Sequence, residues 1–186
     1  MARRIPIVTR EEVAPEYLAA YDEIAGIRGR PPVVGPSSVM VHSPEMAVRA
    51  NRLSEFLGES DEMPERFKRL AALISARSMD CQYVWNAQAA AARRAGVGDA
   101  LVDAIRDKTQ LPAMSAEESA LVTYGMELTA TNQVSEETFS AARDQLGVKG
   151  LVEFTTNMGY YRMISLNANA CTIELPGDMT EPLLPI

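Results

Sequence analysis

The sequence predicts an all-α protein of about eight helices. Apolar residues recur at helical spacing along most of the 186 residues, and capping residues and glycines divide the chain into segments of helical length. No segment alternates apolar and polar residues as a strand does, apart from a possible short stretch at Val39-Met40-Val41. With 47% hydrophobic and 23% charged residues, the composition is that of a globular protein with a sizeable core.

The first sixty residues contain two predicted helices with a loop between them. Thr9 and Glu12 have the spacing of a capping box, which predicts the start of a helix that ends in the glycine-rich stretch before the loop. Residues 30–38 contain three prolines and a glycine and predict the loop. Ser43, followed by a proline, suits an N-cap, and Gly58 is the expected end of the second helix.

Six further helices are predicted in the rest of the chain. The last is apolar on nearly all faces, which is typical of a buried helix. In chain order they comprise 64–78, 81–95, a short helix from Asp99, a helix from the Ser115–Glu118 capping box through Leu128, a helix from Ser135 to just before Gly147, and 151–171. We therefore expect one domain, with an N-terminal helical extension (1–60), a core (61–172) and an extended, proline-rich tail (173–186).

Charge and residue content exclude several classes of function. The net charge of −7 argues against a nucleic-acid-binding protein. No apolar run approaches the ~18 residues of a membrane helix, and the start of the chain lacks the apolar region of a secretory signal. His42 is the only histidine, so a multi-histidine zinc site is excluded, and we expect neither a metal nor a cofactor. Two cysteines are too few for a disulfide framework and favour a cytoplasmic location.

One predicted helix face carries most of the candidate chemical groups. Positions i, i+3, i+4 and i+7 of this face hold Cys81, Val84, Trp85 and Gln88. Arg69 lies on the preceding predicted helix and approaches this face if the two helices form an antiparallel hairpin. We therefore expect a thiol, an indole, an amide and a guanidinium to line one pocket.

Several short motifs occur in a fixed order along the chain. In the middle they are Lys68-Arg69-Leu70-Ala71, Ala76-Arg77, Tyr83-Val84-Trp85 and Ala95-Gly96. Outside that stretch they are Arg4-Ile5-Pro6, His42-Ser43-Pro44-Glu45, Gly159-Tyr160-Tyr161 and Leu166-Asn167. Together they resemble the carboxymuconolactone decarboxylase and alkylhydroperoxidase D-like family over nearly the whole chain. The resemblance implies an alkylhydroperoxidase D-like helical bundle and a homo-oligomer, either a trimer or a hexamer.

Three of the four reactive positions of that family hold a different residue here. By the resemblance, the relay glutamate falls at Arg69, the second cysteine or glutamate at Val84, and the proton-handling histidine at Gln88. Cys81 keeps the position of the first cysteine. A dithiol peroxidase needs a resolving thiol and a base that forms the thiolate, so we do not expect that activity.

The favoured hypothesis is a carboxymuconolactone decarboxylase-like enzyme. It would be a cofactor-free lyase or isomerase that acts by proton transfer on a small anionic or carbonyl-containing molecule. The expected substrate-binding residues are Arg69, Trp85, Gln88 and Tyr161, and the expected catalytic residues are Cys81 and His42. This mechanism requires His42, Cys81 and Arg69 to open onto one cavity.

Each of these residues also has a structural alternative. Arg69 would instead form an ion pair with Glu62 or Glu65, Cys81 and Trp85 would fill the core or a subunit contact, and His42 would belong to the helix start at Ser43. Two other functions stay open. One is a non-catalytic oligomer that binds a small molecule on the same scaffold, and the other is a one-cysteine thiol peroxidase that uses Cys81.

Overall fold

The computed structural model describes residues 2–186, and in this range the chain forms eight α-helices and no strand. The helices are α1 (Leu18–Arg28), α2 (Ser37–Met40), α3 (Pro44–Glu59), α4 (Glu65–Ser78), α5 (Gln82–Arg94), α6 (Asp99–Asp107), α7 (Ala116–Thr131) and α8 (Glu136–Cys171). The all-α fold class and the expected number of helices are confirmed. None of the helices in the described range has the length and apolar character needed to cross a lipid bilayer.

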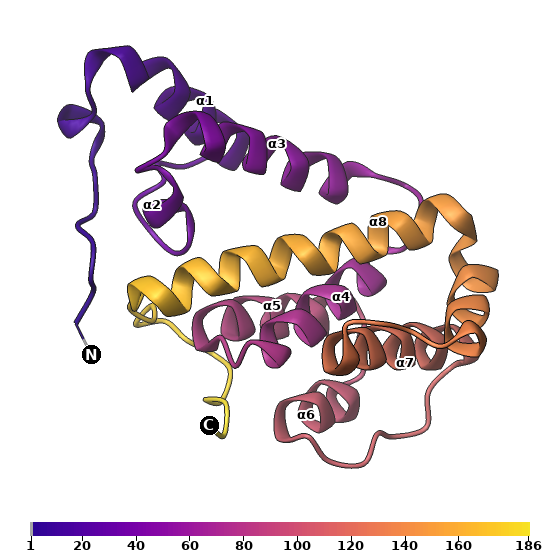
Figure 1. Cartoon of the computed structure of the whole chain (residues 1–186). Coiled ribbons are helices and arrows are strands. Elements are labelled where there is room, and N and C mark those ends of the chain that lie inside the picture. Colours follow the sequence, from indigo (N-terminus) through magenta and orange to yellow (C-terminus); the bar gives the residue numbers. More distant parts are fainter. Residues whose placement is uncertain (1) are drawn as a thin grey trace.

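The long helix α8 runs between two groups of helices (Figure 1). Helices α1 to α3 lie on one side of it, and α4 to α7 lie on the other. The larger core cluster includes the fully buried Leu70, Trp85 and Phe154, and a smaller cluster joins the N-terminal helices to α8. The two clusters meet at Tyr161 and Ile164, which pack against both. The candidate functional site lies at this seam between the two clusters.

The first helix begins later than predicted. The capping box is present, with the Thr9 N–H donating to the Glu12 carboxylate at 2.8 Å, but it caps a single 3-10 turn. Helix α1 begins only at Leu18, after a second short turn that starts at Pro15. The proline disfavours a helical conformation at Ala14, whose ψ is 141°, and therefore separates the capping box from the helix.

The extended stretch suggested at residues 39–41 was wrong. Ser37–Met40 form the short helix α2, because the carbonyl of Pro36 accepts from the N–H groups of Val39 at 3.1 Å and Met40 at 3.0 Å. All four residues of α2 are buried. The apolar run is therefore a helical turn packed against the rest of the molecule.

Helix α8 contains both of the last two predicted helices. They meet without a loop at Gly147, whose φ of 67° and ψ of 176° lie in a region that is essentially restricted to glycine. Figure 1 shows the sharp change of direction at this point. The prediction of two helices was correct, and only the length of their connection was overestimated.

A buried lysine joins the end of α3 to α4. The Lys68 ammonium donates to the carbonyl oxygens of Gly58 and Ser60, both at 2.7 Å, and so satisfies carbonyl groups left free at the end of α3. The side chain of Asn157 on α8 donates to the Lys68 carbonyl at 3.0 Å. These contacts hold the N-terminal segment (residues 2–60) against the two central helices.

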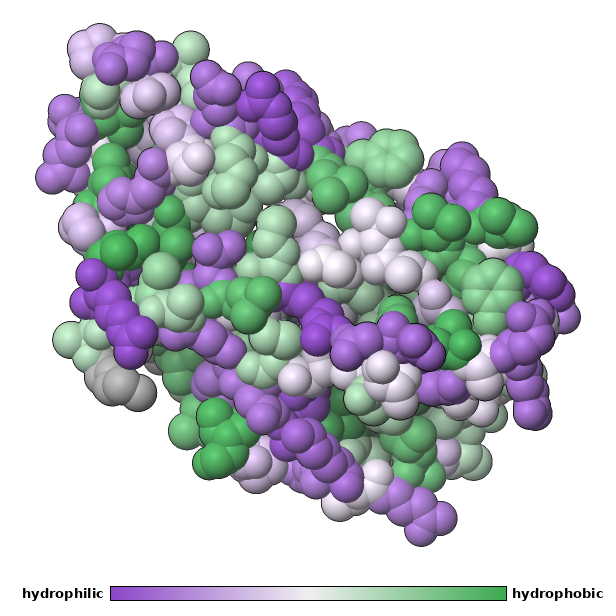
Figure 2. All heavy atoms as spheres, in the orientation of Figure 1, coloured by the Kyte–Doolittle hydropathy of each residue, from purple (hydrophilic) through white to green (hydrophobic). Residues whose placement is uncertain are grey.

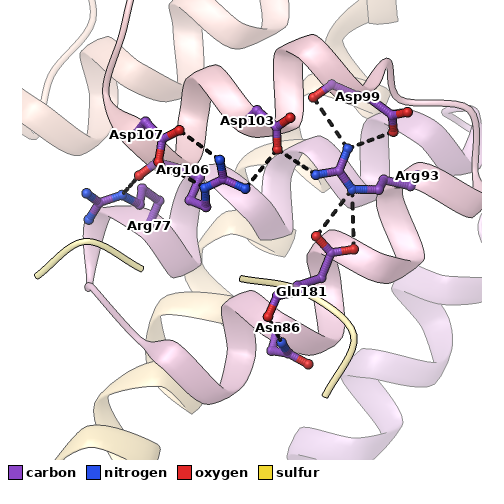
Figure 3. A network of polar contacts seen from close by, with 8 residues as sticks. All are labelled: Arg77, Asn86, Arg93, Asp99, Asp103, Arg106, Asp107 and Glu181. Carbon is purple, nitrogen blue, oxygen red and sulfur yellow. Dashed lines mark hydrogen bonds and ion pairs between the residues drawn. The ribbon is translucent and has the colours of Figure 1, made fainter. Parts of the chain in front are cut away.

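The C-terminal tail is held by one face of α5. Asn86 donates to the Glu181 carbonyl at 3.0 Å, and Arg93 contacts the Glu181 carboxylate at 3.2 Å (Figure 3). Arg93 also pairs with Asp99 at 2.6 Å and Asp103 at 2.7 Å, so the tail, α5 and α6 share one ionic network. Helical spacing places this face of α5 opposite the face that carries Gln88.

Replacing Gly147 with alanine tests the connection inside α8. Because a Cβ at this φ and ψ is strained, Gly147→Ala should lower the free energy of unfolding by about 1–3 kcal/mol. Gly159→Ala is the matched control, since Gly159 lies in the regular part of the same helix and a Cβ added there would have nothing within 4 Å. It should be neutral or stabilising by up to about 1 kcal/mol. Chemical denaturation followed by circular dichroism measures both, and equal effects would contradict the assignment.

Candidate functional site

The α4–α5 hairpin brings Arg69 and Gln88 together. A guanidinium nitrogen of Arg69 donates to Gln88 Oε1 at 2.9 Å. The turn between the two helices is tight: Asp80 has a φ of 44° and pairs with Arg77, and the next residue, Cys81, is the N-cap of α5. The hairpin expected from the sequence therefore exists, and it aligns these two positions.

The same guanidinium also contacts an acid and faces a phenol. Arg69 pairs with Glu65, one turn earlier on α4, at 2.6 Å. On its other side lies Tyr161 of α8, close enough for the arginine charge to influence the ionisation of the phenol. The ion pair was the structural alternative for Arg69, and it coexists with the contact to Gln88. The guanidinium of Arg69 is therefore already bonded to two side chains, and its contact with Gln88 fixes the orientation of that amide.

The environment of Tyr161 keeps its hydroxyl protonated. Burial raises the pKa of Tyr161 above the ordinary value, and the positive charge of Arg69 opposes this rise only in part. The phenol is consequently a hydrogen-bond donor at neutral pH. Burial also raises the pKa of Tyr83 on α5, against the opposing charges of Arg30 and Arg28.

A pocket of about 180 Å³ opens between the N-terminal segment and the core at this point. From the core, its wall includes Val84, Gln88 and Tyr161. From the N-terminal segment, it includes Arg28 and Arg30. The pocket is therefore formed by both halves of the molecule, and its polar groups are mostly amide, phenol and guanidinium.

A glycine allows the loop before α2 to close over one side of this pocket. Gly35 has a φ of 63°, and a Cβ placed there would lie 2.6 Å from the Tyr83 hydroxyl oxygen. The backbone of the loop thus lies directly against the Tyr83 ring. Glycine is required at position 35 for two reasons: the positive φ disfavours other residues, and a Cβ would collide with the Tyr83 ring.

Of the six predicted site residues, only Gln88 and Tyr161 border this pocket. Arg69 contacts Gln88 but does not border the pocket itself, and the other three lie elsewhere. Cys81 is fully buried beside Ser165, and Trp85 is fully buried in the larger core cluster. His42 is exposed, lies 2.9 Å from the Pro6 carbonyl oxygen through Nε2, and borders a separate hollow next to α3. The requirement that His42, Cys81 and Arg69 open onto one cavity is thus not met in this arrangement.

The Cys81 thiol lies in an environment that disfavours the thiolate. Burial raises the pKa of Cys81, and the nearby backbone N–H of Val84 at the start of α5 opposes this rise without reversing it. Cys81 and Cys171 are both free thiols. Within residues 2–186, no three His, Cys, Asp or Glu side chains are grouped so that they could hold a metal ion.

Arg28 and Arg30 are the pocket residues that sequence analysis missed. They lie at the end of α1 and just beyond it, in a stretch that the sequence predicts only as a helix end and the start of a loop. The one available signal was the pair of arginines around Gly29, which carries no information about what the helix end faces. Only the packing of α1 and α2 over α5 and α8 brings them to the pocket.

Comparison with known proteins establishes the fold. No protein-family profile and no curated protein matches the chain. A cysteine-to-alanine variant of the debrominase Bmp8, solved in complex with 2,3,4-tribromopyrrole, has a TM-score of 0.71 at 18% identity, over 95% of this chain and 94% of that chain. The alkylhydroperoxidase AhpD core of an uncharacterized peroxidase-related protein from Ralstonia eutropha JMP134 has a TM-score of 0.71 at 14% identity, over 95% and 93%.

A peroxidase-related protein from Silicibacter sp. TM1040 gives the same values: a TM-score of 0.71 and 14% identity over 95% and 93%. These similarities define the class of protein as an all-α helical bundle of the alkylhydroperoxidase D-like kind. The chain has the alkylhydroperoxidase D-like fold, as the resemblance in its sequence implied.

The protection of Cys81 is directly measurable. Because the thiol is buried and its pKa is raised, alkylation of the native protein by iodoacetamide at pH ~7.5 should modify Cys171, which is half-buried, well before Cys81. Mass spectrometry of peptides measures both rates in one sample, and the same reaction in denaturant provides the reference. Alkylation of Cys81 at the denatured rate would show that the thiol is accessible and would contradict its placement.

Proposed function

We propose that this protein is a cofactor-free lyase or isomerase that acts by proton transfer on a small anionic or carbonyl-containing molecule. The observation that supports it best is that Gln88 and Tyr161 both border the pocket, while Arg69, outside the lining, donates to Gln88 and lies near Tyr161. A guanidinium thus orients an amide and lies beside a phenol, and both of these polar side chains border the pocket. This is the kind of pre-arranged polar group that stabilises developing charge in a reaction.

Gln88 is proposed to bind a substrate oxygen. Its Oε1 accepts from Arg69, so its amide NH₂ is left to donate to a carbonyl or carboxylate in the pocket. Arg69 then acts as a positioning residue that sets the orientation of the amide. This differs from the role of direct anion anchor that its sequence position first suggested.

Tyr161 is proposed to be the proton donor. Its hydroxyl is protonated at neutral pH, and the nearby Arg69 favours the phenolate that forms when the proton is transferred, which opposes the rise in pKa caused by burial. A positioned proton donor typically contributes about 10²- to 10⁴-fold to a rate, and the charge of Arg69 is what the proposal relies on to offset the effect of burial. The proposal gives Tyr161 this part because His42 and Cys81, the residues first expected to carry a proton, lie outside the pocket.

The second candidate is a non-catalytic protein that binds a small molecule in the same pocket. The specific observation in its favour is that the thiol of Cys81 is buried away from the pocket and the family's acidic and histidine positions are Arg69 and Gln88. The one-cysteine peroxidase is supported less, because a peroxide would have to reach a fully buried thiol whose pKa is raised. The debrominase Bmp8, with tribromopyrrole bound, is an example of this fold with a small planar ligand.

We also propose that the protein is a homo-oligomer, a trimer or a hexamer, of the cytoplasm. Helix α8 exposes Val148 at 69% and Val152 at 60%, and these border a hollow that also includes Phe139. Figure 2 shows hydrophobic spheres on the surface near the bend of α8. Contiguous exposed apolar surface of this kind is typical of a subunit contact.

The proton-transfer proposal predicts a specific loss of turnover. In D₂O, we expect the protein to catalyse exchange of the carboxylate for deuterium in members of a panel of small β-keto and lactone carboxylates: the C–C bond breaks, carbon dioxide leaves, and Tyr161 delivers a solvent-derived deuteron to the carbon. Proton NMR follows the reaction. Tyr161→Phe should lower kcat by about 10²-fold or more, whereas Gln88→Leu should mainly raise KM.

Tyr124→Phe is the matched control for this experiment. It removes a hydroxyl that contacts Thr155 Oγ1 at 2.8 Å and does not border the pocket, so it should leave turnover unchanged. Equal turnover by wild type and Tyr161→Phe would contradict the role of Tyr161. Binding of a panel member without any exchange would instead support the non-catalytic candidate.

The oligomer proposal predicts a change in mass on substitution of the exposed apolar surface. Light scattering after size-exclusion chromatography should give wild type the mass of a multimer, and Val152→Asp should shift it towards the monomer because a charge is expensive to bury in a contact. Ala130→Asp, at an exposed position of α7, should not change the mass. A monomeric wild type would rule the proposal out.

A further inference from the structure

We propose that Arg28 and Arg30 form an oxyanion subsite, so that the ligand of the pocket is a small organic carboxylate whose anionic end faces the N-terminal segment. This inference rests on the proposed function only in using the same pocket. The proposed function allows either an anionic or a neutral carbonyl ligand in either orientation. The present inference specifies a carboxylate and the direction in which it binds. It also gives the N-terminal helices a part in ligand recognition.

The Arg28 side chain is half-buried and poorly partnered. Its Nε is buried without a hydrogen-bond partner, and one terminal nitrogen makes only a long contact of 3.4 Å to Asn51 Oδ1. Burial lowers the pKa of Arg28, and the like charge of Arg30 lowers it further. A guanidinium partly removed from water in this way is stabilised when a carboxylate binds to it in the two-pronged geometry that the fork of donors favours.

Among residues 2–186, neither Arg28 nor Arg30 forms an ion pair with a carboxylate, although Glu59 borders the same outer hollow as both. Glu55 borders this hollow too, but it pairs with Arg52 at 2.8 Å. Elsewhere in the described chain, most arginines have an acidic partner, as Arg93 does with three of them. Arg30 is exposed, so the argument rests on Arg28, whose partly buried guanidinium has no acidic partner and would gain one from a bound anion.

The remaining walls fit the uncharged part of such a ligand. Between the arginines and Gln88, the pocket is bordered by Val84 and Ile164 and by the ring of Tyr83. These side chains offer apolar and aromatic surface but no further charge. A carboxylate at Arg28 would direct the rest of the molecule towards the Gln88 amide and the Tyr161 hydroxyl.

Binding of benzoate and benzamide separates the charge of a ligand from its shape. Titration calorimetry and thermal unfolding of the full-length protein should show that benzoate binds and raises Tm, and that benzamide, its neutral counterpart, does so at least about tenfold more weakly. Inorganic phosphate, which lacks the apolar part, should also bind more weakly than benzoate. Phosphate binding more tightly than benzoate, or benzamide binding as tightly, would overturn the assignment of an organic carboxylate.

Substitutions locate the subsite. Arg28→Gln and Arg30→Gln should each weaken benzoate at least about tenfold, while Arg49→Gln, which removes an exposed arginine of α3 that pairs with Glu45, should not. Without ligand, Arg28→Gln should unfold at the same Tm as wild type or higher, because it removes a half-buried, unpaired charge. That last measurement shows that the variant is folded. Unchanged benzoate affinity in folded Arg28→Gln would overturn the inference.

Failure of this inference and failure of the proposed function give different results. If Arg28→Gln binds benzoate normally while Tyr161→Phe still loses turnover, the subsite is wrong and the catalytic proposal stands. If benzoate binding depends on Arg28 but no member of the carboxylate panel is turned over, the subsite stands and the catalytic proposal is wrong.

Discussion

The site depends on one guanidinium at the place where three helices meet. Arg69 on α4 holds Gln88 on α5 at 2.9 Å and lies beside Tyr161 on α8, while Glu65 balances its charge at 2.6 Å. A half-exposed ion pair of this kind adds little to stability by itself. Its importance is geometric, because the planar fork of donors fixes an amide and faces a phenol at the same time.

The pocket lies where the two hydrophobic clusters of the protein meet. These clusters lie on opposite sides of α8, and polar side chains are tolerated where they meet. Tyr161 and Ile164 pack against both clusters, and the loop around Gly35 closes the seam by lying against the Tyr83 ring. The N-terminal helices therefore do more than cover the core, since they bring Arg28 to the same opening.

By the correspondence that the sequence resemblance implies, three positions of the site differ from the family in a consistent way. A position expected to hold an acid is the cation Arg69, a position expected to hold a second thiol is the apolar Val84, and the retained thiol of Cys81 is buried with a raised pKa. The buried thiol with its raised pKa disfavours thiolate chemistry, and the proposed binding of an anion or a carbonyl group agrees with this arrangement. The fold that the protein shares with a debrominase and with peroxidase-related proteins does not itself select among these activities.

The sequence by itself determined most of the helices, because apolar periodicity and capping residues are local. It indicated that Arg69 would approach Gln88 if α4 and α5 formed a hairpin, and the structure shows that they do. The sequence did not determine what each helix face would meet. The face shared by Cys81 and Trp85 turned out to be core, and only the docking of the N-terminal segment added Arg28 to the pocket. Periodicity fixes which residues share a face, whereas long-range packing decides whether that face is opposed by side chains or by a cavity.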